Sequence, residues 1–157
     1  MVAFASATIA RATLQAVMTN PPASVTDMAR AIAEVLAAAR AVRWAYLFGS
    51  AARGEGFADL DVAVMLASSE SGVLPLGSLA ADLERAAGSV PVDLVDLASA
   101  APALAGRIAR EGRVLVDREP ERRKLWEIEA NRRALDIEPW LREFERLRRK
   151  ALLERAG

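Results

Sequence analysis

Cysteine and histidine are both absent from the 157 residues of this sequence. Without cysteine, disulfide bonds, thiolate nucleophiles and cysteine-based zinc sites are excluded. Without histidine, serine–histidine–aspartate catalysis, histidine metal ligands and a histidine general base are excluded as well. Any chemistry must therefore use carboxylates, hydroxyls, lysine or arginine, and a bound metal would be an oxygen-liganded ion such as magnesium.

An excess of charge of one sign is also missing, because 21 basic and 21 acidic side chains cancel. A chain without positive excess is a poor candidate for nonspecific nucleic-acid binding. The charge is nevertheless unevenly distributed, since residues 1–117 carry a net charge of −3 and residues 118–157 carry +3. The basic C-terminal segment could therefore meet an acidic partner.

Long apolar runs are lacking too. None approaches the roughly 20 residues that a membrane-spanning helix needs. The mildly apolar start, Met1 to Ala10, has no lysine or arginine ahead of it and so is unlike a signal peptide. We therefore expect a cytoplasmic protein, with room for one compact domain.

Hydrophobic spacing and turn residues predict alternating helices and strands. Helices are expected over residues 25–40, 79–87, 104–111, 120–135 and 138–155. Strands are expected over residues 42–48, 59–66, 90–97 and 114–116, with a loop over 68–77. Pro139 is expected to separate the last two helices. This order predicts a small α/β or α+β domain, with a poorly defined segment over 1–23, a core over 24–118 and a helical extension over 119–157.

The stretch from Leu47 to Val64 contains the residues with the clearest chemical meaning. A predicted strand runs into Gly49 and Ser50, where a glycine lets backbone N–H groups approach an anion and the serine hydroxyl can donate to a phosphate oxygen. Asp59 and Asp61 follow, and residues two apart on a strand share a face. Their carboxylates are therefore expected to point the same way and to bind metal ions.

A third carboxylate, Asp93, can come from a neighbouring strand. Three converging carboxylates raise one another's pKa unless a cation is bound, so the set favours magnesium. Each feature alone has a structural explanation: Gly49-Ser50 is typical of a turn and helix cap, and Arg53 of a surface charge. The functional interpretation depends on the combination, in this order along the chain.

Other polar and aromatic residues receive structural interpretations. Asp96 is expected to be a turn or cap residue at the end of its strand. The three tryptophans are expected in the core or in helix packing. As the alternative, Trp140, Phe144 and Leu147 form a partner-binding face on the C-terminal helix.

Three motifs together resemble a known family: Gly49-Ser-Ala-Ala-Arg-Gly, Asp59-Leu-Asp61 and Val92-Asp93-Leu-Val. They resemble the polymerase-β-type nucleotidyltransferase superfamily. More narrowly, they are similar to the minimal nucleotidyltransferase (MNT) family, the antitoxin half of HEPN/MNT toxin–antitoxin pairs. The similarity covers about residues 25–120. One departure is Ala58, where the family usually has serine, so that a hydrogen bond near the site is missing.

The resemblance implies a small mixed sheet flanked by helices, ATP as substrate and two Mg²⁺ ions. It also implies that the protein transfers AMP to a tyrosine of a cognate HEPN RNase toxin and so neutralises it, without a membrane or stably bound nucleic acid. Carried over by position, the nucleotide-binding residues are Gly49, Ser50 and Arg53, and the metal-binding and catalytic residues are Asp59, Asp61 and Asp93. In that scheme Gly49 and Ser50 hold the β- and γ-phosphates, and Asp93 helps to take the proton of the attacking hydroxyl.

Two other functions stay open at this point. The protein could neutralise its toxin by binding alone, for which Ala58 leaves some room. It could also transfer a nucleotide to a small molecule, but the segment after residue 118 leaves little space for the acceptor-binding domain that such enzymes usually carry.

Overall fold

A four-stranded mixed sheet is the centre of the protein, seen in a computed structural model that describes residues 24–55, 58–67 and 73–156. Its strands are β1 (Val42–Phe48), β2 (Leu60–Leu66), β3 (Val92–Asp96) and β4 (Arg113–Asp117). Their spatial order is β3-β2-β1-β4, with β1 antiparallel to both neighbours and β2 parallel to β3. The expected small mixed sheet flanked by helices is therefore confirmed.

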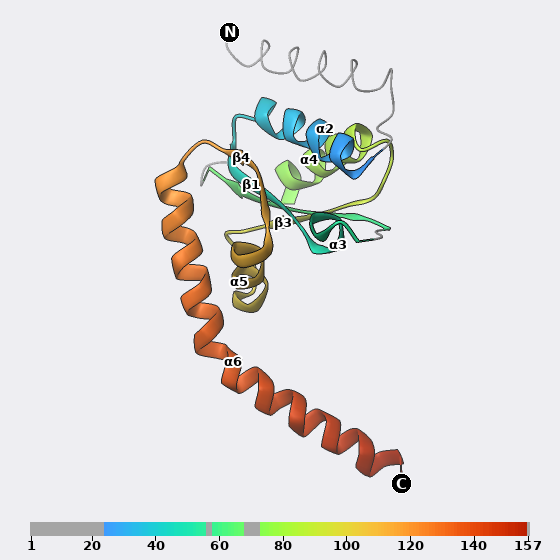
Figure 1. Ribbon diagram of the computed structural model, residues 1–157, viewed down its shortest axis with the longest axis vertical. Coiled ribbons are helices and arrows are strands. Elements are labelled where there is room, and N and C mark those ends of the chain that lie inside the picture. The colour runs from blue at the N-terminus through green and yellow to red at the C-terminus, as the bar shows by residue number, and fades with distance from the viewer. Residues whose placement is uncertain (1–23, 56–57, 68–72, 157) are drawn as a thin grey trace.

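Helices cover both faces of this sheet (Figure 1). They are α2 (Val25–Ala38), α3 (Gly49–Arg53), α4 (Val73–Ala86), α5 (Pro102–Glu111) and α6 (Pro120–Ala156). Helices α2 and α4 lie on one face, while α5 and the first half of α6 lie on the other. No helix in these described ranges is long and apolar enough to cross a membrane.

Alternation along the strands explains the two apolar layers, because successive strand residues point to opposite faces. Val62 and Val64 of β2 join the layer beneath α2, where Ile32 is fully buried. Tyr46 of β1 points to the other layer and lies with Ile108 of α5. The central strands are therefore buried on both faces, which is why β1 reads as an almost continuous apolar run.

A group of charged and polar side chains, here called the anchor cluster, joins α6 to the sheet. It consists of Tyr46, Asp117, Arg123 and Glu127. The Tyr46 hydroxyl, on a residue only 1% exposed, donates to Glu127 at 2.7 Å. Arg123 donates to Asp117 at 2.8 Å and also to Glu127. Burial, followed by the hydrogen bond to Glu127, raises the pKa of Tyr46, so this phenol stays protonated.

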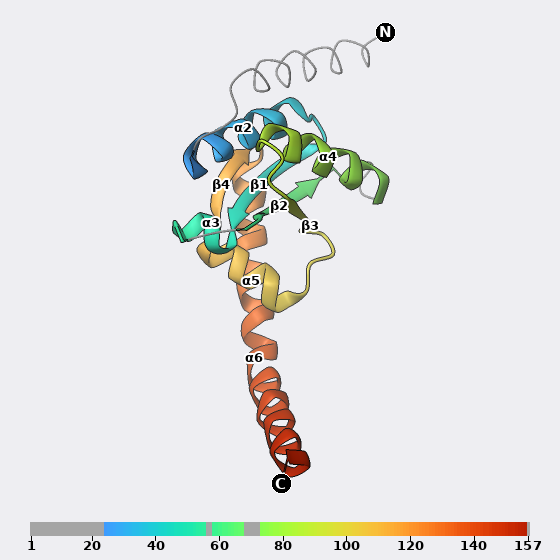
Figure 2. The ribbon, with the colours of Figure 1, turned by 90° about the vertical axis from the view of Figure 1, so that its right-hand side faces the viewer.

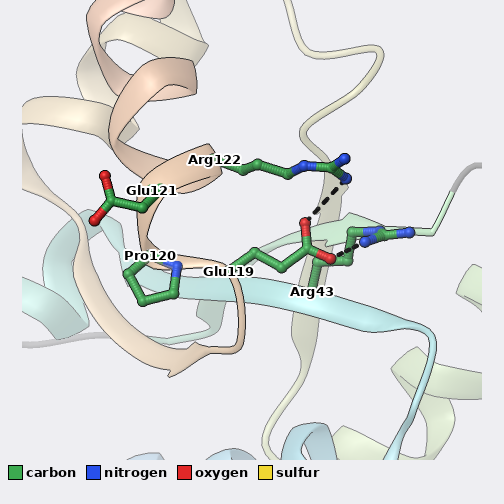
Figure 3. A pocket seen from close by; sticks show the side chains of 5 residues that line it. All are labelled: Arg43, Glu119, Pro120, Glu121 and Arg122. Atoms are coloured by element: carbon green, nitrogen blue, oxygen red, sulfur yellow. Dashed lines mark hydrogen bonds and ion pairs between the residues drawn. The ribbon is translucent and has the colours of Figure 1, made fainter.

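A second ion-pair group closes the turn that leads into α6 (Figure 3). Glu119 accepts hydrogen bonds from Arg43 and from Arg122, the latter at 3.3 Å. Together with Pro120 and Glu121 these residues line an open pocket of about 530 Å³. Two arginines and two glutamates balance there, so the pocket offers no unbalanced charge to a ligand.

The long helix α6 corrects one expectation from the sequence. It continues through Pro139, so the predicted break there is wrong. A proline inside a helix removes one hydrogen bond and bends the axis, and α6 changes direction about half way along (Figure 1). The Arg142–Glu138 ion pair, at 3.4 Å, spans the proline. Residues 139–156, here called the projecting half, extend beyond the domain (Figure 2).

Other element boundaries agree with the sequence or shift by a few residues. The predicted strand over 42–48 is confirmed, and Asp96 has the expected turn role, because its carboxylate accepts from the Ala98 N–H at 2.9 Å. The loop expected over 68–77 is wrong for residues 73–77, where α4 has already begun. Residues 1–23 and 68–72 lie outside the described part of the chain.

The tryptophans divide between core and surface. Trp44 is buried, and its ring centroid lies 6.4 Å from that of Trp126, as expected for packing residues. Trp140 is 66% exposed, so its placement in the core or in helix packing is wrong. The alternative interpretation, a partner-binding face, remains for this residue.

Candidate active site

The candidate site begins where β1 ends. Gly49 follows Phe48 with a φ of +69°, a left-handed conformation that glycine adopts without strain. The short helix α3 starts at this glycine and ends at Gly54, whose φ is +73°. Ser50, in the first turn of α3, is half-buried. The strand running into Gly49 and Ser50 that the sequence predicts is therefore present.

Asp61 of β2 lies directly against this bend. In the sheet it pairs with Phe48 on one side and with Asp93 on the other. A Cβ atom placed on Gly49 would lie 1.9 Å from Oδ2 of Asp61, far inside van der Waals contact. The missing side chain of Gly49 therefore makes the space that the Asp61 carboxylate occupies.

The other two predicted carboxylates lie at the edge of the site. Asp93 is the second residue of β3 and is exposed. Asp59 is also exposed but lies in a bend before β2, so the expectation of two aspartates on one strand is wrong. The extended conformation begins only at Leu60, where the backbone starts to pair with β3.

The charges of Asp59 and Asp93 both act on the carboxyl group of Asp61. Burial raises the pKa of Asp61, and the negative charges of Asp59 and Asp93 raise it further. Arg107 and Arg53 lower it, but they do not cancel the other effects. Asp59, Asp61 and Asp93, here called the carboxylate site, therefore hold more negative charge than the neighbouring arginines neutralise.

Metal binding at the carboxylate site fits the chemistry of its donors. Three carboxylates with unbalanced negative charge are hard oxygen ligands of the kind that Mg²⁺ prefers. Within the described residues, however, no three acidic side chains converge closely enough to hold a metal ion as they stand. The three carboxylates lie in one region of the structure, and binding of a metal ion would require them to move closer together.

Two arginines line the rim. Arg53, predicted from the sequence, donates to Glu55 at 2.8 Å and lies 3.9 Å from Glu111 of α5. These contacts tie the loop after α3 to the end of α5. Arg107 was not foreseen, because only the fold places α5 beside the start of β2. Its side chain is exposed, and no acidic residue of the described ranges forms an ion pair or hydrogen bond with it.

Comparison with known families gives the class of this protein. The chain belongs to the polymerase beta nucleotidyltransferase family, whose model matches residues 30–121. The match includes the Gly49 bend and all three residues of the carboxylate site. No curated protein matches the chain significantly in sequence.

Solved structures narrow the likeness to toxin–antitoxin proteins. A chain of a toxin–antitoxin complex with AMP-PNP is 25% identical, with a TM-score of 0.51 over 74% of this chain and 86% of its own length. A chain in the structure of a mutant of the toxin–antitoxin pair MntA-HpeT is 24% identical, with a TM-score of 0.52 over 75% and 87%. A chain in the structure of the tri-AMPylated Shewanella oneidensis HEPN toxin in complex with MNT antitoxin is 25% identical, with a TM-score of 0.47 over 74% and 84%.

Proposed function

We propose that this protein is an antitoxin that transfers AMP from ATP to a tyrosine of a cognate HEPN-domain toxin. The observation that carries this proposal is the Asp61 carboxylate seated on Gly49 at the end of β1, with Asp93 beside it in register. In a member of the nucleotidyltransferase family, this juxtaposition places acidic groups beside a bend suited to phosphate. Because the reaction consumes ATP, we place it in the cytoplasm.

The nucleotide is proposed to bind with its triphosphate at the bend. Backbone N–H groups near Gly49 and the Ser50 hydroxyl donate to the β- and γ-phosphate oxygens. Arg107 and Arg53 lie close enough to Asp61 to lower its pKa, and they supply positive charge at the rim of the site. A similar protein has been solved with AMP-PNP, which supports an adenine nucleotide as the substrate.

Asp59 and Asp61 are proposed to hold Mg²⁺ ions, and Asp93 to share the catalytic one. When bound, magnesium neutralises charge on the triphosphate and polarises the α-phosphorus. The unbalanced negative charge of the carboxylate site supports this assignment, since a cation relieves the repulsion among its members.

The transfer itself requires one bond to form and one to break. The tyrosine oxygen attacks the α-phosphorus, and the bond from that phosphorus to the oxygen bridging it to the β-phosphate breaks. Pyrophosphate leaves, and the hydroxyl proton passes to the carboxylate of Asp93. The residues contribute mainly by positioning the reactants and by balancing charge.

The test is the mass of a cognate HEPN-domain protein after incubation with this protein, ATP and Mg²⁺. We expect a gain of one or more AMP units with the wild-type protein. With Asp59→Ala/Asp61→Ala we expect a loss of at least about 100-fold in rate, because removing residues that merely orient a metal ligand already costs up to that much. Asp82→Ala is the matched control, since this aspartate lies on α4, across the sheet.

Three results separate the competing explanations. Full labelling by the double variant would refute the assignment of the carboxylate site. Neutralisation of the toxin by both proteins, without labelling by either, would show that binding alone is the function. Transfer of AMP to a small molecule in place of the toxin would identify a different acceptor.

A further inference from the structure

Large exposed apolar side chains gather on α6. Outside α6, Val114 is the one exposed large apolar residue in the described ranges. Those on α6 form two sets, one in the half packed on the domain and one in the projecting half: Leu125, Ile128 and Leu135, and Trp140, Phe144 and Leu147. Exposed apolar clusters mark interaction surfaces. Among the described residues, α6 is therefore the element best suited to an apolar contact with another protein.

The set in the projecting half has the composition of a binding surface. Trp140 is 66% exposed, Phe144 51% and Leu147 50%. The rings of Trp140 and Phe144 stack with their centroids 5.5 Å apart. Spacings of four and three residues place the three side chains on one stripe of the helix. Tryptophan in particular is enriched among the residues that contribute most to protein–protein affinity.

Charge separates the projecting half from the rest of the molecule. Residues 139–157 carry six basic and three acidic side chains, a net charge of +3, while residues 118–138 are neutral. In the neutral half, Arg132 is bonded to both Glu129 and Asp136. In the projecting half, Arg146 pairs with Glu143, while no acidic side chain described up to residue 151 forms an ion pair with Arg148 or Arg149. The charge there favours a partner with an acidic surface.

The direction of the projecting half also suits a partner that must reach the carboxylate site. It bends toward the side of the domain on which α3 lies (Figure 1) and continues beyond α5 (Figure 2). At 1.5 Å per residue, residues 139–156 extend about 27 Å. A folded domain of ordinary size has a diameter of roughly 30 Å. Such a domain can lie along the helix and still approach the end of β1.

We infer that the projecting half of α6 is the docking surface for the acceptor protein, which binds it through an acidic surface with an apolar centre. This inference rests on the proposed function, because the acceptor is the HEPN-domain toxin of that proposal. A second copy of this chain is a poorer occupant, because pairing two projecting halves brings two segments of charge +3 together.

The test compares two triple variants of the full chain. Trp140→Ala/Phe144→Ala/Leu147→Ala removes the proposed surface. Leu125→Ala/Ile128→Ala/Leu135→Ala removes apolar residues of the neutral half that are at least as exposed. Alanine maintains the helix in both, and circular dichroism checks this. The probe is the cognate HEPN-domain toxin of the proposed function, and its Kd is measured by calorimetry without ATP.

We expect the first triple variant to raise Kd by at least about tenfold, and Arg148→Glu/Arg149→Glu to do the same with a weaker salt dependence. The control triple variant should change Kd by less than about threefold. In the AMP-transfer assay the first variant should raise KM for the toxin while kcat at saturation stays close to that of the wild type.

Equal binding by the two triple variants would overturn the inference, as would no binding of the toxin by the wild type. Toxin binding without AMP transfer would refute the proposed function but not the docking surface. AMP transfer by the first triple variant with an unaltered KM for the toxin would refute the docking surface but not the proposed function. A different result would assign the surface to nucleic acid: the wild type binds a labelled single-stranded RNA, and Arg148→Glu/Arg149→Glu loses this binding while its toxin binding is unchanged.

Discussion

The anchor cluster and the carboxylate site both collect charged side chains on the α5–α6 side of the sheet, but they balance charge differently. In the anchor cluster, Arg123 donates to Asp117 and to Glu127, and Glu127 also accepts from Tyr46. In the carboxylate site, three carboxylates meet only arginines at a distance. Each carboxylate of the anchor cluster has Arg123 as an ion-pair partner, although the buried Oδ1 of Asp117 accepts no hydrogen bond. No described arginine lies within ion-pair distance of Asp59, Asp61 or Asp93, so the carboxylate site is the better place for a cation.

This comparison predicts that substitutions in the two clusters change folding stability in opposite directions, and the loss in the anchor cluster is the largest effect predicted here. Arg123→Ala leaves Asp117 and Glu127 without their cation in a partly buried place, so the free energy of unfolding should fall by about 2–3 kcal/mol. Asp61→Asn removes one of three repelling charges and should raise the melting temperature slightly. Urea and thermal unfolding without magnesium measure both changes.

The pH dependence of folding stability tests independently whether the Asp61 carboxylate destabilises the folded protein. Folding raises the pKa of Asp61, so the proton on this carboxyl stabilises the folded state. This stability is complete below the pKa of the unfolded chain and is lost as the pH rises through the folded pKa. Asp61→Asn should lack that loss. Destabilisation by Asp61→Asn throughout the pH range would mean that the carboxylate is a structural group like those of the anchor cluster.

Local features of the sequence predicted much of the fold. The run from Val42 to Phe48 is apolar and ends at a glycine, so the bounds of β1 followed directly. The start of α4 was missed, because Pro75 and Gly77 are typical of loops. Continuation of α6 through Pro139 was missed because a proline can either end a helix or only bend it, and the local sequence does not decide between the two.

The candidate site was predictable only in part, for a similar reason. Spacing identified Gly49 and the aspartates as candidates, but it could not show that Asp61 lies between Phe48 and Asp93. That arrangement depends on the strand order, in which β1 and β3 flank β2. Arg107 had no local signal at all, since its nearness to Asp61 arises from the path of α5 across the sheet.

The fit of Gly49 against Asp61 gives the second prediction. Gly49→Ala and Gly54→Ala both place alanine at positive φ, which costs about 1–2 kcal/mol in each case. Only at Gly49 does the new Cβ meet a carboxylate, whereas nothing lies within 4 Å of a Cβ at Gly54. The AMP-transfer rate should fall by about 10- to 100-fold in Gly49→Ala, because Asp61 must move.

Gly54→Ala is the matched control, and its rate should stay within about threefold of the wild type once the folded fraction is equal. Similar rates for the two variants would show that the seat of Asp61 on Gly49 does not matter for transfer. The carboxylate site would then tolerate displacement, as a ligand-binding site should not.

The smallest expected effect concerns the cations of the two clusters. Arg123 is fixed by two carboxylates, whereas Arg107 has no ion-pair partner in the described ranges and is available to a ligand. Arg107→Ala should raise KM for ATP by about three- to tenfold with little change in kcat, because one exposed charge contributes at most modestly to binding. Arg110→Ala on the same helix is the control, since Arg110 donates to Asn131 at 3.2 Å. An equal rise in both variants would mean that α5 attracts the nucleotide only by its general charge, and that Arg107 has no special place at the rim.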